Sequence, residues 1–424
     1  MKLQVALDFV DLDRAVNVAK EAVAGGVDLI EAGTPLIKSA GLNSVRKLRA
    51  QFPDKKIVAD MKITDVGRVE VEAAAKAGAN IVTVLALTSD ATIKETVKSA
   101  KNFGCEVMAD LMNVRDIKKR AAEVEKMGVD YLCVHVGIDQ QMEGQTPMKQ
   151  LRDLSKTAKI PIAVAGGINS ENVVNAVEAG ASIIIVGGAI TKAQDAKEAA
   201  RRIKAAMSTG SPVTTELFKK YTSMDIVLAK VSTANISDAM HRAYSIDIKP
   251  LVEGTKIFGR AVTVRCAPGD WAKPVEAIDI AEKGDVIIID SGGVGPAVWG
   301  ELATESSIQK GIAGVIINGA ARDTSDIRKL RFPLFARLVM SNAGEPKGIG
   351  EINVPVTISG KTINPGDWII ADDDGVMVIP KEDAMEVSNR AIDVLEKENR
   401  VRKEIKHGST LSKVCHIREW ECCA

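Results

Sequence analysis

The first 207 residues alternate short β-branched runs with longer amphipathic stretches, and this repetition constrains the fold more than any other feature of the sequence. Successive runs start about 20–29 residues apart, which leaves room for one crossover helix after each. Several of the intervening stretches end in glycine just before the next run, as in AVAGGVD and EKMGVD, and glycine there is a common helix stop signal. The eight runs are residues 3–7, 27–33, 56–60, 80–85, 105–111, 131–137, 160–167 and 182–188.

Eight βα units of this length predict an α/β fold in which residues 1–207 form a closed (β/α)8 barrel, the TIM barrel. An open, doubly wound sheet is the alternative, but equal units without a topological break favour closure. The polar segment STGSPVT, residues 208–214, contains Pro212 and predicts a linker.

Beyond the linker the regular repeat ends, and we expect a separate mixed α/β domain over residues 215–407. Residues 215–243 and 381–407 read as helices. Residues 408–424 are expected to be a tail, because the Cys and His of CHIREWECCA fit no standard zinc spacing. The strand-like runs of this half are residues 256–266, 285–293, 313–319, 334–339, 354–360 and 367–380.

The composition excludes several classes of protein. Among 424 residues, 56 are Lys or Arg and 56 are Asp or Glu, so the chain shows no basic footprint for nucleic acid or for an anionic membrane. No apolar run reaches the ~20 residues of a membrane span, and the opening MKLQVALDF has no signal-peptide layout. The six Cys have no framework spacing. We therefore expect a cytoplasmic protein with reduced thiols.

Ionisable residues gather where the barrel strands are expected to end. The segment IVADMKITDVG, residues 57–67, starts as a buried strand and then places two carboxylates and an ammonium within six residues. Catalytic groups of a (β/α)8 barrel lie at the carboxyl ends of its strands. Charges brought together there must each be desolvated or paired, which costs free energy, so their presence favours a functional role. The residues at these ends are Asp8, Glu31, Asp60, Lys62, Asp65, Asp110 and His135.

Two glycine pairs follow the last two strands: Gly166 and Gly167 in VAGGI, and Gly187 and Gly188 in VGGAI. Glycine lets a ligand approach the backbone N–H groups, and the loops after strands seven and eight are the usual phosphate site of this fold. The sequence therefore predicts a phosphorylated substrate.

The acids and the histidine predict the remaining chemistry. Glu31 and Asp60, on adjacent strand ends, suit a hard cation with oxygen ligands, above all Mg²⁺. Such a cation can hold the two oxygens of an ene-diolate. His135 can transfer protons near neutral pH.

DMKITD matches the Asp-x-Lys-x-x-Asp signature of the orotidine 5′-phosphate decarboxylase suprafamily. Residues 1–207 resemble its 3-hexulose-6-phosphate synthase branch in LQVALD, EAGTPLIKSAG, IVTVLALTSDATI, VHVGIDQQ and IIIVGGAI. The decarboxylating branch has an Arg shortly after the sixth-strand His, where this chain has Asp139. The resemblance therefore implies the aldolase branch, which joins ribulose 5-phosphate and formaldehyde into arabino-3-hexulose 6-phosphate or runs the reverse reaction.

The resemblance also implies roles for the strand-end residues. Glu31 and Asp60 would bind Mg²⁺, and Asp8, Lys62 and Asp110 would contact the sugar hydroxyls and the developing charge. Asp65 would reach across a dimer interface into the neighbouring site. His135 would be the general base at C1.

The second half contains GVIINGAARD and resembles the family of the regulator of ribonuclease activity A and the 4-hydroxy-4-methyl-2-oxoglutarate aldolases over residues 225–405. The resemblance implies a β/β/α sandwich, commonly trimeric. It also implies a second divalent metal held by Asp323, with Glu301 contributing through water, and a pyruvyl carboxylate held by Arg322. Asn318 departs from the Asp of most relatives. Family members without proven chemistry bind ribonuclease E or have unknown roles, so this half is expected to be either an aldolase or a protein-binding module.

The expected whole is a bifunctional homo-oligomer, with dimeric barrels and trimeric C-terminal domains. The alternative is a sugar-phosphate decarboxylase of the same suprafamily joined to a non-catalytic protein-binding module. A scaffold without catalysis is disfavoured by the set of strand-end residues.

Overall fold

The computed structural model describes residues 1–215, 217, 224–415 and 417. The chain divides into two compact units, one made of residues 1–218 with 396–424 and the other of residues 219–395. The expected change of architecture after residue 207 lies close to the first division. At the other end, residues 396–407, which the sequence pattern groups with the second domain, cluster instead with the barrel.

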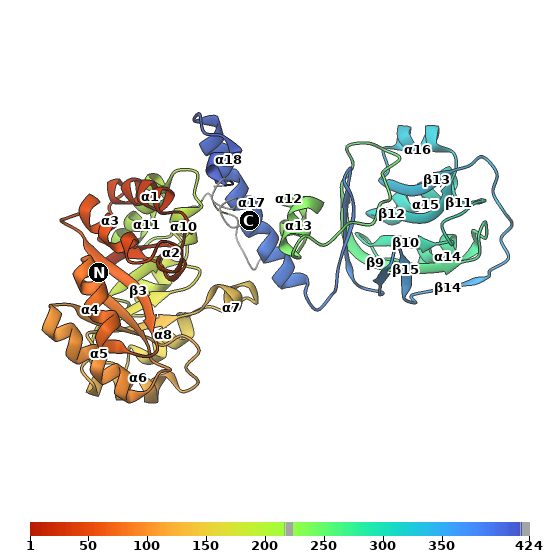
Figure 1. Ribbon diagram of the computed structural model, residues 1–424. Coiled ribbons are helices and arrows are strands. Elements are labelled where there is room, and N and C mark those ends of the chain that lie inside the picture. The colour runs from red at the N-terminus through yellow and green to blue at the C-terminus, as the bar shows by residue number, and fades with distance from the viewer. Residues whose placement is uncertain (216, 218–223, 416, 418–424) are drawn as a thin grey trace. The chain divides into compact units, whose positions relative to one another are not determined.

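The first unit is a closed barrel of eight parallel strands, as the repeat predicts (Figure 1). Strand β1 pairs with both β2 and β8, which closes the sheet and excludes the open alternative. The strands are β1 (Lys2–Leu7), β2 (Leu29–Ala32), β3 (Lys56–Ile63), β4 (Ile81–Leu85), β5 (Glu106–Asp110), β6 (Tyr131–His135), β7 (Ile162–Ala165) and β8 (Ile183–Val186).

Helices cover the outside of the barrel. In α5, Ser89 accepts a hydrogen bond from Thr92 N at the start, and Gly104 ends the helix in the left-handed conformation. Its buried face, with Ile93 and Val97, joins the core between helices and strands. The helices of this unit are α1 (Leu12–Ala24), α2 (Thr34–Ala40), α3 (Asn43–Gln51), α4 (Gly67–Ala77), α5 (Asp90–Phe103), α6 (Ile117–Lys126), α7 (Ile138–Met142), α8 (Met148–Leu154), α9 (Val173–Glu178), α10 (Gly188–Thr191) and α11 (Ala196–Thr209).

The interior of the barrel changes character along its axis. Side chains alternate along a strand, and the inward positions Leu29, Val58, Met108 and Cys133 form an apolar layer. Two residues further along the same four strands, the inward positions are Glu31, Asp60, Asp110 and His135. This spacing places the ionisable groups on an apolar floor at the carboxyl end of the barrel.

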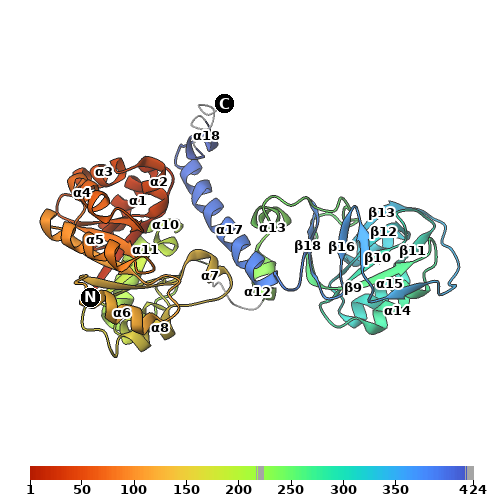
Figure 2. The ribbon, with the colours of Figure 1, turned by 60° about the horizontal axis from the view of Figure 1, so that its bottom comes forward.

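The second unit is a mixed sheet in the order β11-β12-β10-β9-β17-β18, with β13 and β14 paired to β12 and β9 (Figure 2). Strands β9, β10 and β12 are parallel, while β17 runs antiparallel to β9. The strands are β9 (Ile257–Cys266), β10 (Val286–Asp290), β11 (Ala297–Trp299), β12 (Gly314–Ala321), β13 (Leu334–Val339), β14 (Gly350–Ile352), β15 (Val356–Ile358), β16 (Lys361–Ile363), β17 (Trp368–Asp372) and β18 (Gly375–Ile379).

Alternate residues of β10 enter two different cores, which makes this unit a β/β/α sandwich. Ile287 and Ile289 pack with apolar residues of the helical layer, among them Ile278 of α14. Val286 and Ile288 pack instead with the β15–β16 hairpin and its neighbours. The remaining helices of the chain are α12 (Met224–Lys230), α13 (Thr233–Ala239), α14 (Ala272–Ile280), α15 (Glu301–Lys310), α16 (Thr324–Leu330), α17 (Ala384–Lys406) and α18 (Leu411–Val414).

The expected tail, residues 408–424, contains the short helix α18 (Leu411–Val414), while His416 and the last two cysteines lie outside the described residues. Among the helices that the structure describes, none combines the length and apolar character needed to cross a membrane.

Candidate active site

Lys62 links two strand ends at the barrel mouth. Its Nζ lies 3.0 Å from Asp60 Oδ2 and 2.8 Å from Asp110 Oδ2. Its backbone has φ +46, a left-handed conformation that is uncommon for a residue with a side chain, and its N–H donates to Thr83 Oγ1. Burial lowers the pKa of the ammonium, but the two carboxylates outweigh this effect and raise its pKa above the ordinary value. Lys62 is therefore a fixed positive charge at the centre of the site.

Asp110 and His135 form a second link, between β5 and β6. His135 Nδ1 lies 2.9 Å from Asp110 Oδ2, and Met112 N donates to Oδ1 of the same carboxylate. Burial alone would raise the pKa of Asp110, but hydrogen bonding and positive charge from His135, together with Lys62, lower it below the ordinary value. An ionised Asp110 orients the imidazole and leaves Nε2 as the nitrogen for proton transfer.

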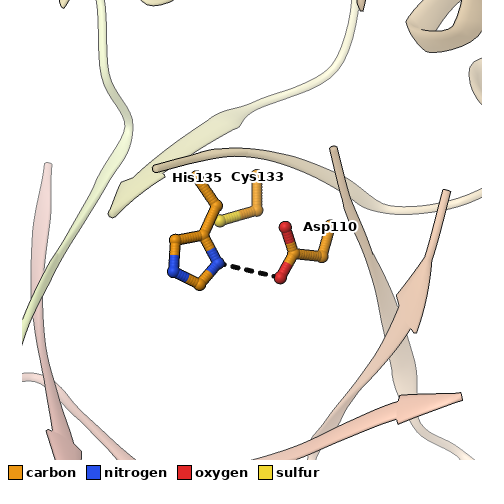
Figure 3. Close-up of side chains that lie close together, drawn as sticks. All are labelled: Asp110, Cys133 and His135. Carbon is orange, nitrogen blue, oxygen red and sulfur yellow. Dashed lines mark hydrogen bonds and ion pairs between the residues drawn. The ribbon is translucent and has the colours of Figure 1, made fainter. Parts of the chain in front are cut away.

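Cys133 lies beside this pair, as Figure 3 shows. Its sulfur, a ring nitrogen of His135 and a carboxylate oxygen of Asp110 lie within 4.8 Å of one another, a spacing that could suit a metal ion. However, both Asp110 oxygens already accept hydrogen bonds, and burial raises the pKa of the Cys133 thiol well above its ordinary value. A protonated thiol is a poor metal ligand. We therefore interpret these three residues as a hydrogen-bonded His135–Asp110 pair above Cys133, which packs in the apolar layer.

Asp8, Glu31 and Asp60 form the acidic side of the site. Burial, with repulsion from Asp60 and Asp8, raises the pKa of Glu31 well above its ordinary value. Asp8 lies open to the barrel mouth, yet loss of water around its carboxylate and repulsion from Asp60 raise its pKa as well. The carboxylates of Asp8, Glu31 and Asp60 repel one another, and Lys62 relieves only part of this repulsion. Carboxylate oxygens arranged in this way suit a hard divalent cation. Glu31 and Asp60 would hold that cation.

Polar residues that the sequence analysis did not single out support these acids. Thr34 Oγ1 and Thr83 Oγ1 donate to the two oxygens of Asp60 at 2.7 and 2.8 Å. Gln4 donates through Nε2 to Glu31, while its buried Oε1 has no partner in the described structure. The signal was available, because Gln4 and Thr83 are polar residues at inward positions of otherwise apolar strands.

Glycines make room at several strand ends around the mouth. A Cβ at Gly33 would lie 2.2 Å from Asp8 Oδ1 and 2.9 Å from the backbone Leu7 O, so a larger residue would force a shift there. Gly166 and Gly167 have φ +120 and +65, and a Cβ at Gly166 would lie 2.8 Å from Val136 O. The positive φ angles and the close backbone contact explain why residues 166 and 167 are glycines. Without side chains at these two positions, their backbone N–H groups are accessible to an anion.

Gly187 and Gly188 lie between Asp8 and Lys192. A Cβ at Gly187 would come within 3.5 Å of Asp8 Oδ2, and one at Gly188 within 3.2 Å of Lys192 Nζ. Burial and Asp60 raise the pKa of Asp8, and the positive charge of Lys192 is among the effects that oppose this rise. The sequence analysis missed Lys192, which brings a cation to the loop where a phosphate was expected.

Asp65 and Asp139 lie apart from this cluster. The Asp65 side chain is exposed in the turn between β3 and α4, where it accepts from the neighbouring Val66 N. Asp139 is exposed in the short helix α7. Among the described residues of the barrel unit, no contact joins Asp65 to the other strand-end groups.

The predicted residues of the second unit meet at the start of α15. Asp323 Oδ2 accepts from Glu301 N at 3.1 Å and lies 3.4 Å from Arg322 Nε. Both partners of this ion pair are exposed, and Asp323 has φ +56. Asn318, further back in β12, donates to Asp290 at 2.7 Å and keeps its Oδ1 unpartnered. The structure therefore groups Glu301, Arg322 and Asp323 at an accessible surface.

Known proteins resemble each half of the chain separately. The family described as orotidine 5′-phosphate decarboxylase / HUMPS matches residues 1–203, and the family described as RraA-like, Aldolase/RraA, matches residues 233–378.

The curated relatives match the barrel. The 3-hexulose-6-phosphate synthase of Bacillus subtilis (strain 168) is 42% identical over 205 residues, which cover 48% of this chain and 97% of the relative. That of Staphylococcus aureus (strain USA300) is 38% identical over 208 residues, covering 49% and 99%. A crystal structure of 3-hexulose-6-phosphate synthase from Salmonella typhimurium is 39% identical over 50% of this chain and 100% of that chain, with a TM-score of 0.48.

These matches span nearly the whole length of the synthases but only half of this chain. The second family match covers residues 233–378 of the remaining half. The chain therefore belongs, through its barrel, to the orotidine 5′-phosphate decarboxylase / HUMPS family, and it carries an RraA-like domain after that barrel.

Proposed function

We propose that the barrel is a Mg²⁺-dependent 3-hexulose-6-phosphate synthase, which condenses D-ribulose 5-phosphate with formaldehyde to D-arabino-hex-3-ulose 6-phosphate or catalyses the reverse cleavage. The observation that carries the proposal is the Lys62–Asp110–His135 network beside the Glu31–Asp60 carboxylates. This network combines the proposed base His135, the Lys62 ammonium and a carboxylate pair that would bind the metal. The curated relatives of the barrel are named 3-hexulose-6-phosphate synthases.

The proposed reaction begins with proton transfer. His135 Nε2 removes a proton from C1 of ribulose 5-phosphate, and Asp110 holds the resulting imidazolium in place. The Lys62 ammonium lies where it can offset negative charge on the substrate oxygens. A divalent cation bound by Glu31 and Asp60 would supply further positive charge beside those oxygens.

The carbon–carbon bond forms next. C1, which now carries the electron pair, attacks the carbon of formaldehyde, and the formaldehyde oxygen gains a proton to become the new hydroxyl. That proton is the one that His135 took from C1. Its transfer restores His135 as the free base, so protons and electrons balance. The glycines after β7 and β8, with Lys192, would hold the phosphate at the other end of the substrate.

We propose a second, separate role for the RraA-like domain. Glu301, Arg322 and Asp323 lie together at an accessible surface, which favours divalent-metal binding and turnover of a pyruvyl substrate. A ribonuclease-regulating contact would instead be a protein-binding role that does not need Arg322. Metal-dependent cleavage of 4-hydroxy-4-methyl-2-oxoglutarate that is lost in Arg322→Ala would favour the enzyme.

The assembly and location belong to the same proposal. Exposed Asp65 would complete the site of a second barrel in a dimer, and the second domains would form trimers. We place the protein in the cytoplasm, where the sugar phosphate would be available.

The test of the barrel's function is an assay of the purified chain with ribulose 5-phosphate, formaldehyde and Mg²⁺. We expect consumption of ribulose 5-phosphate that depends on formaldehyde and stops in excess EDTA. In His135→Ala, solvent exchange of the C1 proton should be lost while substrate binding remains, because the base acts on the proton and not on the phosphate.

Cys133→Ala is the matched control on the same strand, since that cysteine has no role in the proposal, and exchange should persist in it. Activity undiminished by EDTA would contradict metal dependence. Normal exchange in His135→Ala would assign the base to another residue.

A further inference from the structure

Arg400, near the end of α17, is a buried cation in the barrel unit. Its side chain is 8% exposed, and a buried guanidinium must find partners for its donors. Nη2 lies 2.8 Å from Glu21 Oε1 on α1, and Nε lies 3.0 Å from Glu404 Oε1. Two carboxylates from different elements therefore hold the guanidinium in one orientation.

The same guanidinium also binds a loop of the barrel. Arg400 Nη1 donates to the carbonyl oxygens of Ala193 and Gln194, each at 3.1 Å, and Lys403 donates to Gln194 O as well. These carbonyls lie between α10 and α11, in the segment that follows the glycine pair of β8. Residues far apart in the sequence thus hold the backbone of this loop.

The loop carries Lys192, whose ammonium lies against Gly188. Lys192 directly precedes the two carbonyls that Arg400 binds. Glu21 ties the other end of the loop, because it accepts from Ala196 N at the start of α11 as well as from Arg400. A shift of the loop backbone would therefore move Lys192 and the glycine pair together.

We infer that Arg400 is a positioning residue for the phosphate-binding loop of the barrel, supplied by the part of the chain that follows the second domain. The inference rests on the proposed function for the identity of the phosphorylated substrate. Arg400 touches no substrate itself. It fixes the backbone that carries the groups facing the phosphate, and small displacements of such groups weaken binding.

Arginine is required for this task because its planar fork serves several acceptors at once. A lysine has one ammonium and cannot reach two carbonyls and a carboxylate in the same geometry. Arg400→Met keeps most of the buried stem and removes the donors. Arg402→Met is the matched control, because Arg402 lies in the same helix, is 53% exposed and pairs only locally, with Glu398 and Asn399, in the contacts described.

The experiment compares these two variants with the wild type in the full-length chain. Calorimetry gives the Kd for inorganic phosphate, and steady-state kinetics give KM for ribulose 5-phosphate and kcat. In Arg400→Met we expect both the Kd and KM to rise about threefold to tenfold, with kcat nearly unchanged. Arg402→Met should match the wild type in all three quantities.

Two results would overturn the inference: an unchanged phosphate Kd in folded Arg400→Met, or a loss confined to kcat. Should Arg400→Met fail to fold, Glu21→Gln weakens the same link from the barrel side, and an unchanged Kd in that variant would equally overturn it. Phosphate binding does not require turnover. A wild type that binds phosphate but consumes no ribulose 5-phosphate would contradict the proposed function, whereas the Arg400 comparison would still decide the inference.

Discussion

Glu31 is the residue at which the needs of the site conflict most directly with the stability of the fold. Its carboxylate is buried beside Asp60 and Asp8, which raises its pKa well above the ordinary value of 4.5. Because its pKa is higher in the folded state, Glu31 stabilises the fold less and less as pH rises from 4.5 toward that higher pKa. The metal-free protein therefore gains less stability from Glu31 as pH rises above 4.5.

We predict that Glu31→Gln raises the free energy of unfolding of the metal-free protein by about 0.5–2 kcal/mol. The amide removes the repulsion and can donate to the unpartnered Gln4 Oε1. Thermal unfolding in EDTA measures the gain, which should shrink as pH falls, because Glu31 then takes up its proton. Added Mg²⁺ should raise the melting temperature of the wild type and leave that of the variant unchanged.

Glu21→Gln is a control for carboxylate loss outside the mouth, and it should show no such stabilisation. A metal-free Glu31→Gln protein that is less stable than the wild type at neutral pH would contradict the electrostatic account.

The sequence allowed the charged residues of the candidate barrel site to be named as strand-end groups, but not the residues that support them. Asp8, Glu31, Asp60, Asp110 and His135 could be named because each stands where an apolar run ends. Lys192 could not, since its approach to the glycine pair depends on how a loop folds. The pairing of Arg400 with that loop spans more than 200 positions, and no local pattern encodes such a contact.

At the scale of elements, the repeat predicted every barrel strand, because parallel strands in a closed barrel are buried on both faces and read as continuous apolar runs. The second unit was harder. Strands β11 and β14 have three residues each, too few to show a period. The helix expected over residues 381–407 matches α17 (Ala384–Lys406), but the division between the two units within it was not predicted, since α17 has no helix breaker near residue 396.

Gly67 controls how closely α4 approaches α5. A Cβ there would lie 2.3 Å from Thr96 Oγ1 and 2.9 Å from Thr92 O, and backbone cannot yield as a flexible side chain can. We predict that Gly67→Ala lowers the free energy of unfolding by about 1–3 kcal/mol. It should also lower activity, because α4 follows β3, which carries Lys62, and the turn that carries Asp65. Denaturant unfolding and the synthase assay measure the two effects.

Gly104→Ala is the control for that variant. Gly104 has φ +70 but open space around the added methyl group, so it should lose only about 1 kcal/mol, the cost of the left-handed backbone. Its activity should stay unchanged. Equal effects in the two variants would show that backbone conformation, and not helix contact, decides the outcome at Gly67.

At the scale of the whole molecule, the two units have separate cores, yet residues after the second unit contribute contacts to the first. The barrel alone should therefore fold, whereas we expect the loop between α10 and α11 to depend on the C-terminal segment that carries Arg400. The barrel site also lacks one predicted member within its own unit, because Asp65 is exposed and apart from the cluster. A second copy of the chain is the source that the family resemblance suggests.

A complementation experiment tests that source. If Asp65 serves the neighbouring barrel, Asp65→Ala and His135→Ala should each be nearly inactive alone, but co-expressed chains should recover about a quarter of the wild-type activity. Half of the dimers would be mixed, and one of their two sites would combine an intact His135 with the partner's intact Asp65. Co-expression of Glu31→Gln with His135→Ala is the matched control and should recover nothing, since both residues belong to the same barrel. Absence of recovery in the first pair, with mixed dimers shown by differently tagged chains, would place Asp65 outside a shared site.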